Sequence, residues 1–368
     1  MIQEIYSAGR FSLTLTDMAD EATINLLKET KYGHPGKTHY TQQQVPERIA
    51  HIPDLHFLQL KSSDKLIGTV GICPHLCNIG GYRKPAAYIR YFSVQNLFAR
   101  DLTNHSKKET HSENVFSKAL ASFFNYNNTF AKLLGEPKET IYYYAFVESQ
   151  NLRSLQMCNR FGFEATGMYD SILFSRFFPK HKPQVKKLAS PDQQPMKELL
   201  CDYFKSYNFF RLEEDWLDDY FIWIENGEPI LGAKARPVTW KIISLAGKSG
   251  KLMKVILPRI PILNKVFNPE SHKFIALDYV YCKPGHESLF PEFFESILAH
   301  TQHYSALLFV DRLSDLHPYF IHSSQMGLMN RINKPVGVNI LVKVSPIENA
   351  ILSHLKNNPT YISTFGTT

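Results

Sequence analysis

Residues Ala145–Phe163, AFVESQNLRSLQMCNRFGF, decide how this chain is expected to fold. The aromatic and β-branched run that enters this stretch, TIYYYAFV, predicts a buried strand. Asn151 is a residue type that caps helices, and Gly162 stands where a helix can end in a left-handed residue. The stretch therefore predicts a strand, a short helix over 152–161 and a further strand over 163–178.

The same signals recur along the rest of the chain and predict more strands and helices. β-Branched and aromatic runs predict strands at 11–16, 55–61, 65–73, 86–94, 274–282, 305–311 and 336–344. Apolar residues at helical spacing predict helices near 18–27, 44–51, 115–124, 196–207, 213–221 and 289–300. The dipeptide Asn226-Gly227 is a strong hairpin signal and predicts a strand pair around it.

Length and one change of composition indicate two domains. A chain of 368 residues is longer than one ordinary core usually holds. Residues 179–195, PKHKPQVKKLASPDQQP, are rich in Pro and Lys, which is typical of a linker. We therefore expect an α/β fold with domains at 1–178 and 196–368. The second domain repeats the element order of the first at low sequence identity.

Composition narrows the classes of partner and the location. The net charge of +7 favours anionic partners, but no nucleic-acid-binding module is recognisable, so we expect no nucleic-acid partner. The five cysteines are scattered and odd in number, as in a reduced cytosolic protein. The N-terminus has no signal-peptide pattern, and no run approaches the ~20 apolar residues of a membrane span. We expect a cytoplasmic protein.

The stretch quoted first resembles a motif of the GNAT superfamily of acyl-CoA-dependent N-acyltransferases. In that family a strand is followed by Asn, a small residue three positions on, often Tyr seven on, and Gly-Phe at the helix end. These positions are Asn151, Ser154, Cys158 and Gly162-Phe163 here. The resemblance implies two tandem domains, each a mixed, mostly antiparallel sheet flanked by helices. It also implies transfer of an acyl group, with acetyl favoured, from acyl-CoA to an amine.

The resemblance also implies where acyl-CoA binds. Its amide arm would lie between the strands at 86–94 and 140–147, and backbone N–H groups at 93–95 would face the thioester. Asn151 and Ser154 would hold the arm, and the loop at 107–112 would receive the pyrophosphate. This loop departs from the family's glycine-rich pattern, and a Cβ obstructs close approach of the backbone. The implied cofactor-binding residues are Ser93, Val94, Gln95, Lys107, Lys108, Thr110, His111, Ser112, Asn151 and Ser154.

Three residues are candidates for the chemistry. Cys158 stands where the family usually has the tyrosine that protonates the leaving thiolate. Glu148 and Tyr91 are candidate bases by location, because the acceptor amine must lose a proton before it attacks. The acceptor is expected to be the amine of a small molecule or peptide, and no metal is implied. The second half lacks the motif, so we expect it to shape the acceptor site or to stabilise the first half.

A basic insertion at 234–267 and two other functions stay open at this stage. Eight Lys or Arg residues and no acid lie between Lys234 and Lys265, with apolar residues interleaved. Such a segment either contacts an anionic surface or is an inserted helix with a solvated basic face. The missing glycines and tyrosine suit a GNAT-like binding module without catalysis. A tandem relative of the Fem-type aminoacyl transferases is the other alternative.

Overall fold

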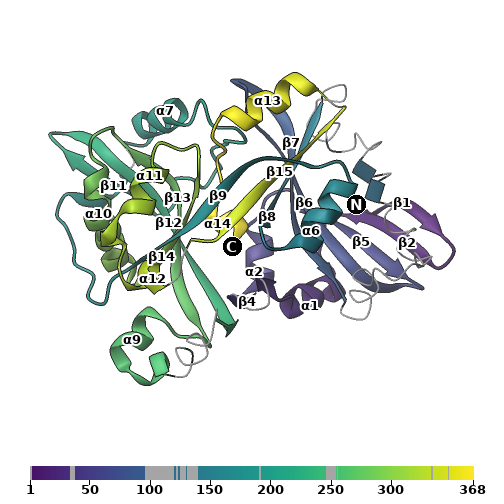
Figure 1. Ribbon diagram of the computed structural model, residues 1–368, viewed down its shortest axis with the longest axis horizontal. Coiled ribbons are helices and arrows are strands. Elements are labelled where there is room, and N and C mark those ends of the chain that lie inside the picture. The colour runs from purple at the N-terminus through teal and green to yellow at the C-terminus, as the bar shows by residue number, and fades with distance from the viewer. Residues whose placement is uncertain are drawn as a thin grey trace.

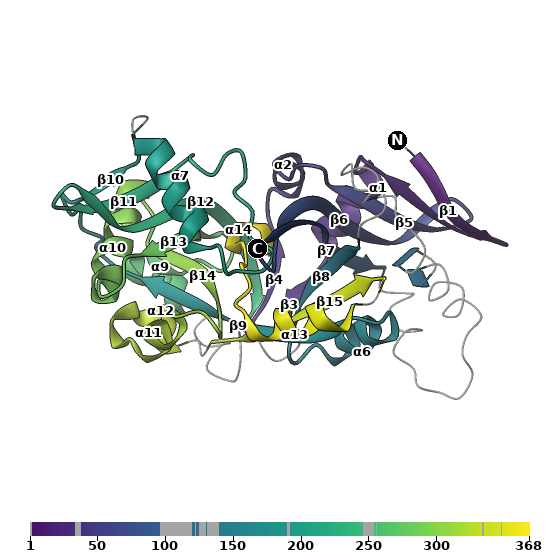
Figure 2. The same ribbon diagram turned by 90° about the horizontal axis from the view of Figure 1, so that it is seen from above.

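The computed structural model describes the whole chain except residues 1, 34–37, 96–119, 122, 125–129, 131–139, 190–191, 246–253, 255, 333–334 and 347. The fold is α/β: one mixed, mostly antiparallel sheet runs through the molecule and carries helices on its faces (Figure 1). The order of its main strands is β1-β2-β5-β6-β7-β8-β15-β9-β14-β13-β12-β11-β10. The N-terminal half of the chain supplies one side of this sheet and the C-terminal half supplies the other (Figure 2).

Six strands form the outer part of the first half. They are β1 (Ile2–Ala8), β2 (Phe11–Thr16), β5 (His56–Ser62), β6 (Lys65–Ile79), β7 (Tyr82–Val94) and β8 (Ile141–Glu148). The short strands β3 (Tyr32–Gly33) and β4 (His39–Gln42) pair with each other, and β4 also pairs with the second half. Within this half, neighbours along the main path are antiparallel, except that β7 and β8 are parallel.

The second half repeats this pattern. Its outer strands are β10 (Val185–Lys187), β11 (Tyr220–Glu225), β12 (Glu228–Ser244), β13 (His272–Cys282) and β14 (Ser305–Asp311). The antiparallel pair of β12 and β13 corresponds to the hairpin of β6 and β7, and β13 and β14 are parallel like β7 and β8. The predicted turn at Asn226-Gly227 joins β11 and β12, with positive φ at both residues.

The two halves exchange their last strands. β15 (Gly337–Ser345), from the C-terminal half, pairs with β8 on one edge and with β9 (Glu164–Ser175) on the other. The later part of β9 pairs along the whole of β14. Ile340 and Val342 of β15 and Phe174 of β9 are fully buried at these crossings. Each half is therefore completed by a strand from the other.

Helices cover both faces of the sheet. In the first half, α1 (Glu21–Glu29) and α2 (Val45–Ala50) lie on one face, and α6 (Leu152–Arg160) packs on the other. The C-terminal half carries α7 (Gln193–Tyr203), α9 (Pro261–Val266), α10 (Phe290–Thr301), α11 (His317–His322), α12 (Leu328–Ile332), α13 (Asn349–Asn357) and α14 (Thr364–Thr367). α14 and the C-terminal residue lie at the centre, between the halves (Figure 1). Among the described helices, none has the length and apolarity needed to cross a bilayer.

Most predicted elements are confirmed, and two are wrong. The predicted strands at 11–16 and 305–311 match β2 and β14 residue for residue. Residues 213–219 form turns instead of a helix, and β11 begins at Tyr220. Residues 234–244 belong to β12, so the inserted basic helix does not begin there. The predicted helix at 115–124 falls largely outside the described residues. The domain boundaries at 178 and 196 stay a prediction.

Separate production of fragments 1–178 and 179–368 tests how far the halves depend on each other. Fragment 1–178 lacks β15, so the edge of β8 and the buried side chains beside it face water. Neither fragment should show a cooperative unfolding transition alone by circular dichroism, whereas the co-expressed pair should co-purify and unfold as one unit. Two independently folding fragments would show that the exchanged strands are dispensable.

Candidate functional site

The parallel strands β7 and β8 diverge within the sheet. They pair only where Ala86–Ile89 lie against Tyr142–Ala145, although β7 runs on to Val94 and β8 to Glu148. Tyr91 has a φ of 51°, and the register of β7 with β6 shifts at this position. An extra residue of this kind bends a strand away from its neighbour. We call the space between the diverging ends, 90–94 and 146–148, the first wedge.

Gly71 accommodates the bend. A Cβ atom at this position would lie 3.1 Å from Cδ2 of Tyr91, closer than side chains normally pack. A bulky side chain here would therefore push Tyr91 out of the cluster that it forms with Leu27, Val45 and Phe57. The bend in β7 is thus specified by Gly71 on one strand and Tyr91 on the next.

The second half also contains two parallel strands that diverge, but a segment of the chain itself lies between them. β13 and β14 pair only at Ile275–Ala276 and Ala306–Leu307, and Tyr279 has a φ of 50°. Thr364 lies between the diverging ends of these strands, which we call the second wedge. The backbone N–H of Phe309 on β14 donates to Oγ1 of Thr364 at 3.1 Å, and the Thr364 N–H donates to Oδ1 of Asp278 on β13 at 2.6 Å.

α6 begins just beyond the end of β8, as predicted. The side chain of Asn151 accepts a hydrogen bond from the backbone N–H of Ser154 at 3.1 Å and caps the helix. Gly162 ends the helix with a φ of 79°. Cys158 packs against the apolar cluster under the helix, and burial raises the pKa of its thiol to about 11. Its predicted role as a proton donor stays a prediction.

The other predicted residues of the first half lie around the first wedge or outside the described chain. Ser93 is buried and its hydroxyl accepts from Oγ1 of Thr30 at 2.8 Å, while Val94 ends β7 half-buried. The backbone N–H of Gln95 donates to Ile67 within the sheet, so it does not face the wedge. Glu148 ends β8 on the opposite side. Lys107, Lys108, Thr110, His111 and Ser112 fall outside the described residues.

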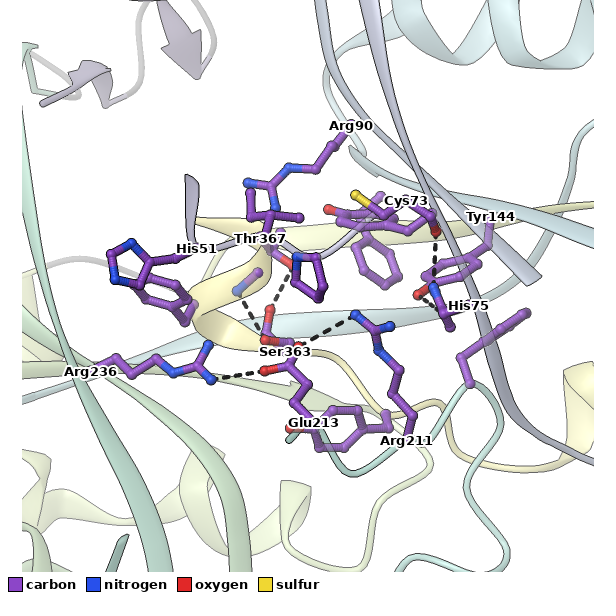
Figure 3. Close-up of a pocket in the computed structure, with 18 of the residues that line it drawn as sticks. His51, Cys73, His75, Arg90, Tyr144, Arg211, Glu213, Arg236, Ser363 and Thr367 are labelled. Atoms are coloured by element: carbon purple, nitrogen blue, oxygen red, sulfur yellow. Dashed lines mark hydrogen bonds and ion pairs between the residues drawn. The ribbon is translucent and has the colours of Figure 1, made fainter. Parts of the chain in front are cut away.

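A pocket lies between the two halves, next to the first wedge (Figure 3). We call it the central pocket, and its volume including the open mouth is about 650 Å³. The first half contributes side chains from β6, β7 and β8, and the second half contributes β12, β13 and the segments 209–213 and 361–367. Its charged lining residues are Arg90, Arg211, Glu213 and Arg236. Aromatic residues such as Tyr88, Tyr144 and Tyr279 make up much of the rest.

The floor of the pocket holds a neutral histidine–tyrosine pair. Nδ1 of His75 lies 2.9 Å from the carbonyl oxygen of Cys73, and its Nε2 lies 3.1 Å from the hydroxyl of Tyr144. Burial, and then the charge of Arg211, hold the pKa of His75 well below its usual 6.5. The imidazole is therefore neutral at pH 7, with Nδ1 donating to the carbonyl and Nε2 accepting from the tyrosine.

The wall from the second half is a compensated ion network. Nη2 of Arg236 lies 2.8 Å from Glu213 and 2.6 Å from Asp215, and Arg211 lies 3.6 Å from Glu213. Asp278 is buried behind this wall, where it also accepts from the backbone N–H groups of the segment in the second wedge. Each arginine on this side thus has an acid beside it.

Sequence reasoning missed the central pocket. Arg211 and Glu213 adjoin the wrongly predicted helix, and Arg236 was grouped with the basic insertion. One signal was available: Glu213 and Asp215 have the same two-residue spacing as Lys234 and Arg236, which share one face of a strand. That these two pairs meet follows from tertiary contacts, which local spacing does not encode.

The fold matches solved acyltransferase structures, whereas the sequence matches no protein-family model and no curated protein. Saccharomyces cerevisiae N-myristoyltransferase with bound myristoyl-CoA matches with a TM-score of 0.56 and 11% identity, over 94% of this chain and 86% of that chain. A second structure of that enzyme, with myristoyl-CoA and inhibitors, gives 0.57 and 11% over 100% and 88%. A GCN5-related N-acetyltransferase from Anabaena variabilis gives 0.47 and 10% over 90% and 72%. The chain has a GNAT-like fold over most of its length.

Replacing Asp278 with Asn should change how stability depends on pH. Burial raises the pKa of Asp278 from 3.8 to about 6. The folded state then binds the proton more tightly than the unfolded chain, so this carboxyl contributes stability below pH 4 and loses it as pH rises to about 6. The free energy of unfolding of Asp278→Asn relative to wild type should therefore rise across this range, by about 3 kcal/mol at most.

Chemical unfolding at pH 4, 5, 6 and 7 measures this difference. Asp202→Asn is a matched control, because the side chain of Asp202 is 72% exposed on α7. A difference that falls as pH rises would mean that hydrogen bonds to Asp278 favour its charged form over its protonated form.

Proposed function

We propose that the protein is an acyl-CoA-dependent N-acyltransferase whose acyl-CoA lies in the first wedge. The observation that carries this proposal is the divergence of β7 and β8 after Ile89 and Ala145. An extended amide-bearing arm can add to the exposed edges of diverging strands through main-chain hydrogen bonds. The fold supports it, since two matching structures are described as holding myristoyl-CoA.

The contrast between the wedges supports a single donor site. In the second wedge Thr364 hydrogen bonds to both strands, so the chain itself takes the place of an arm. This occupied position leaves the first wedge as the candidate donor site. The start of α6 stands at the open end of the first wedge, where Asn151 and Ser154 would meet the arm.

The proposed reaction needs four events around the thioester. The acceptor amine, as its neutral form, attacks the carbonyl carbon and forms the C–N bond. The C–S bond then breaks, the amine gives up its remaining extra proton, and the CoA thiolate takes up a proton as it leaves. The central pocket adjoins the first wedge, so we assign the acceptor amine to this pocket. Holding both reactants together supplies much of the rate.

The acyl group, acceptor and location are the finer parts of the proposal. The sequence resemblance favours acetyl as the acyl group, whereas the matching structures hold a longer chain, so both belong in the test. The acceptor is the amine of a small molecule or peptide. A cytoplasmic location agrees with five free cysteines.

Binding and turnover with a series of CoA species test the proposal. Thermal melting should rise with CoA, acetyl-CoA or longer acyl-CoAs up to myristoyl-CoA, and free thiol should appear when an amine panel is added. Stabilisation by CoA species without turnover on any amine would favour the binding module. Melting that no CoA species changes would contradict a donor site and favour the aminoacyl-tRNA route.

Asn151 variants separate its capping role from a role in binding. Asn151→Ala should lower the free energy of unfolding by about 1 kcal/mol, because the cap of α6 is lost. Asn151→Ser keeps a capping oxygen and should stay close to wild type in stability. Both variants lack the side-chain amide, so both should raise the KM for acyl-CoA. A wild-type KM in Asn151→Ser would limit Asn151 to a structural role.

A further inference from the structure

Arg90 brings a positive charge, without an ion-pair partner among the described residues, to the wall of the central pocket. It follows Ile89, the last residue of β7 that pairs with β8, so it stands at the apex of the first wedge. Its side chain is 8% exposed and lines the pocket (Figure 3). Nε and Nη2 have no hydrogen-bond partner among the described residues. Its guanidinium instead lies 4.0 Å from the ring centre of Tyr91.

A second buried arginine reinforces this charge. Arg48 of α2 is also 8% exposed, and its Nε and Nη1 have no partner in the described part of the chain. Its Nη2 donates to the carbonyl oxygen of Phe365 at 3.1 Å. Burial and the positive charge of Arg90 both lower the pKa of Arg48. The buried hydroxyls of Tyr32 and Tyr91 also have no hydrogen-bond partner among the described residues.

The two walls of the pocket therefore differ in charge. Across the pocket, Arg211 and Arg236 pair with Glu213, which compensates them. Among the described residues, no carboxylate pairs with Arg48 or Arg90. A buried charge without a partner is unfavourable, so these guanidinium groups have donors available for an anionic group that arrives from outside.

A carboxylate matches this wall better than other groups. The planar guanidinium of arginine presents parallel N–H donors that fit the two oxygens of a carboxylate. Tyr88 and Tyr144, whose rings stack with centroids 5.1 Å apart, line the same pocket as Arg90. Because Arg90 stands at the apex of the first wedge, an anion there lies next to the expected thioester.

We propose that the amine acceptor carries a carboxylate close to its amine, and that Arg90 binds this carboxylate. The inference rests on the proposed acyl transfer for the identity of the ligand as an acceptor. It names the substrate class as amino carboxylic acids, with the amine directed to the first wedge and the remainder of the molecule in the central pocket. Arg48 supports Arg90 by adding positive potential behind it.

Matched acids and amides test the proposal on the full-length protein. The probes are glycine, alanine, leucine, phenylalanine, aspartate and lysine, each compared with its α-amide in calorimetry and in acyl transfer from acyl-CoA. Sodium acetate and sodium phosphate, each against sodium chloride at equal ionic strength, probe the anion site without an amine. The acids should bind and react better than their amides by about 30-fold or more, and acetate should stabilise the protein more than phosphate or chloride.

Variants of Arg90 assign the effect to this residue. Arg90→Met keeps the length of the side chain and should remove the preference for acids and the effect of acetate. Its melting temperature without ligand should equal or exceed that of wild type, because an unpartnered buried charge is removed. Arg90→Lys keeps the positive charge but lacks the parallel N–H donors, so it should retain only part of the preference for acids over amides. Arg83→Met, at an exposed position of the same strand, should change none of these quantities.

The outcomes separate this inference from the proposed function. Transfer to amides and acids alike, or a preference for acids that survives in Arg90→Met, overturns the inference and leaves acyl transfer in place. Acids that bind through Arg90 without any transfer support the carboxylate site and contradict the proposed function. Stronger stabilisation by phosphate than by acetate, or an equal fall in melting temperature in Arg90→Met and Arg90→Lys, also overturns the inference.

Discussion

The reciprocal exchange of β9 and β15 is the constraint on which the rest of the structure depends. Each strand pairs with an element of the other half along most of its length, so neither half has a complete sheet without the other. Asp170 strengthens the crossing, since Arg312 donates to both of its carboxylate oxygens at 2.9 and 3.0 Å. Strands that are joined by continuous ladders of hydrogen bonds move little relative to each other. The two walls of the central pocket are consequently held at a fixed separation, as a site for two reactants requires.

Both halves contain the same bent strand, but the charge of the residue before the bend differs between them. Tyr91 and Tyr279 both occupy left-handed positions in strands that bend away from a parallel neighbour. The residue before each is Arg90 in the first half and Asp278 in the second. Asp278 accepts the N–H groups of the segment that fills the second wedge, whereas Arg90 has no acceptor of this kind in the described chain. One repeat has therefore become a closed structural element, and the other keeps unused hydrogen-bonding capacity.

The sequence predicted local structure well and long-range structure poorly. The run at 140–147, the cap at Asn151 and the stop at Gly162 were recognisable because each depends on residues close in the chain. The helix expected over 213–221 failed because the apolar residues there pack into the second half from turns and the start of β11. The sequence of β15 does not indicate that its partners are β8 and β9 instead of β14, because strand pairing depends on contacts across the whole sheet. The central pocket was hidden for the same reason.

The position of Arg48 and Arg90 also bears on how an amine becomes a nucleophile. An ammonium group held beside Arg90 would be disfavoured by a like charge and by burial, and both effects lower the pKa of an amine. In water, a carboxylate on the same molecule raises the pKa of the amine. This increase is smaller when the guanidinium of Arg90 binds the carboxylate. Glu213, on the opposite wall, is already paired with two arginines and adds little net negative potential. The electrostatics of such a pocket favour the neutral amine. The reaction therefore depends less on a side chain that acts as a base than it would for an amine that keeps its ordinary pKa.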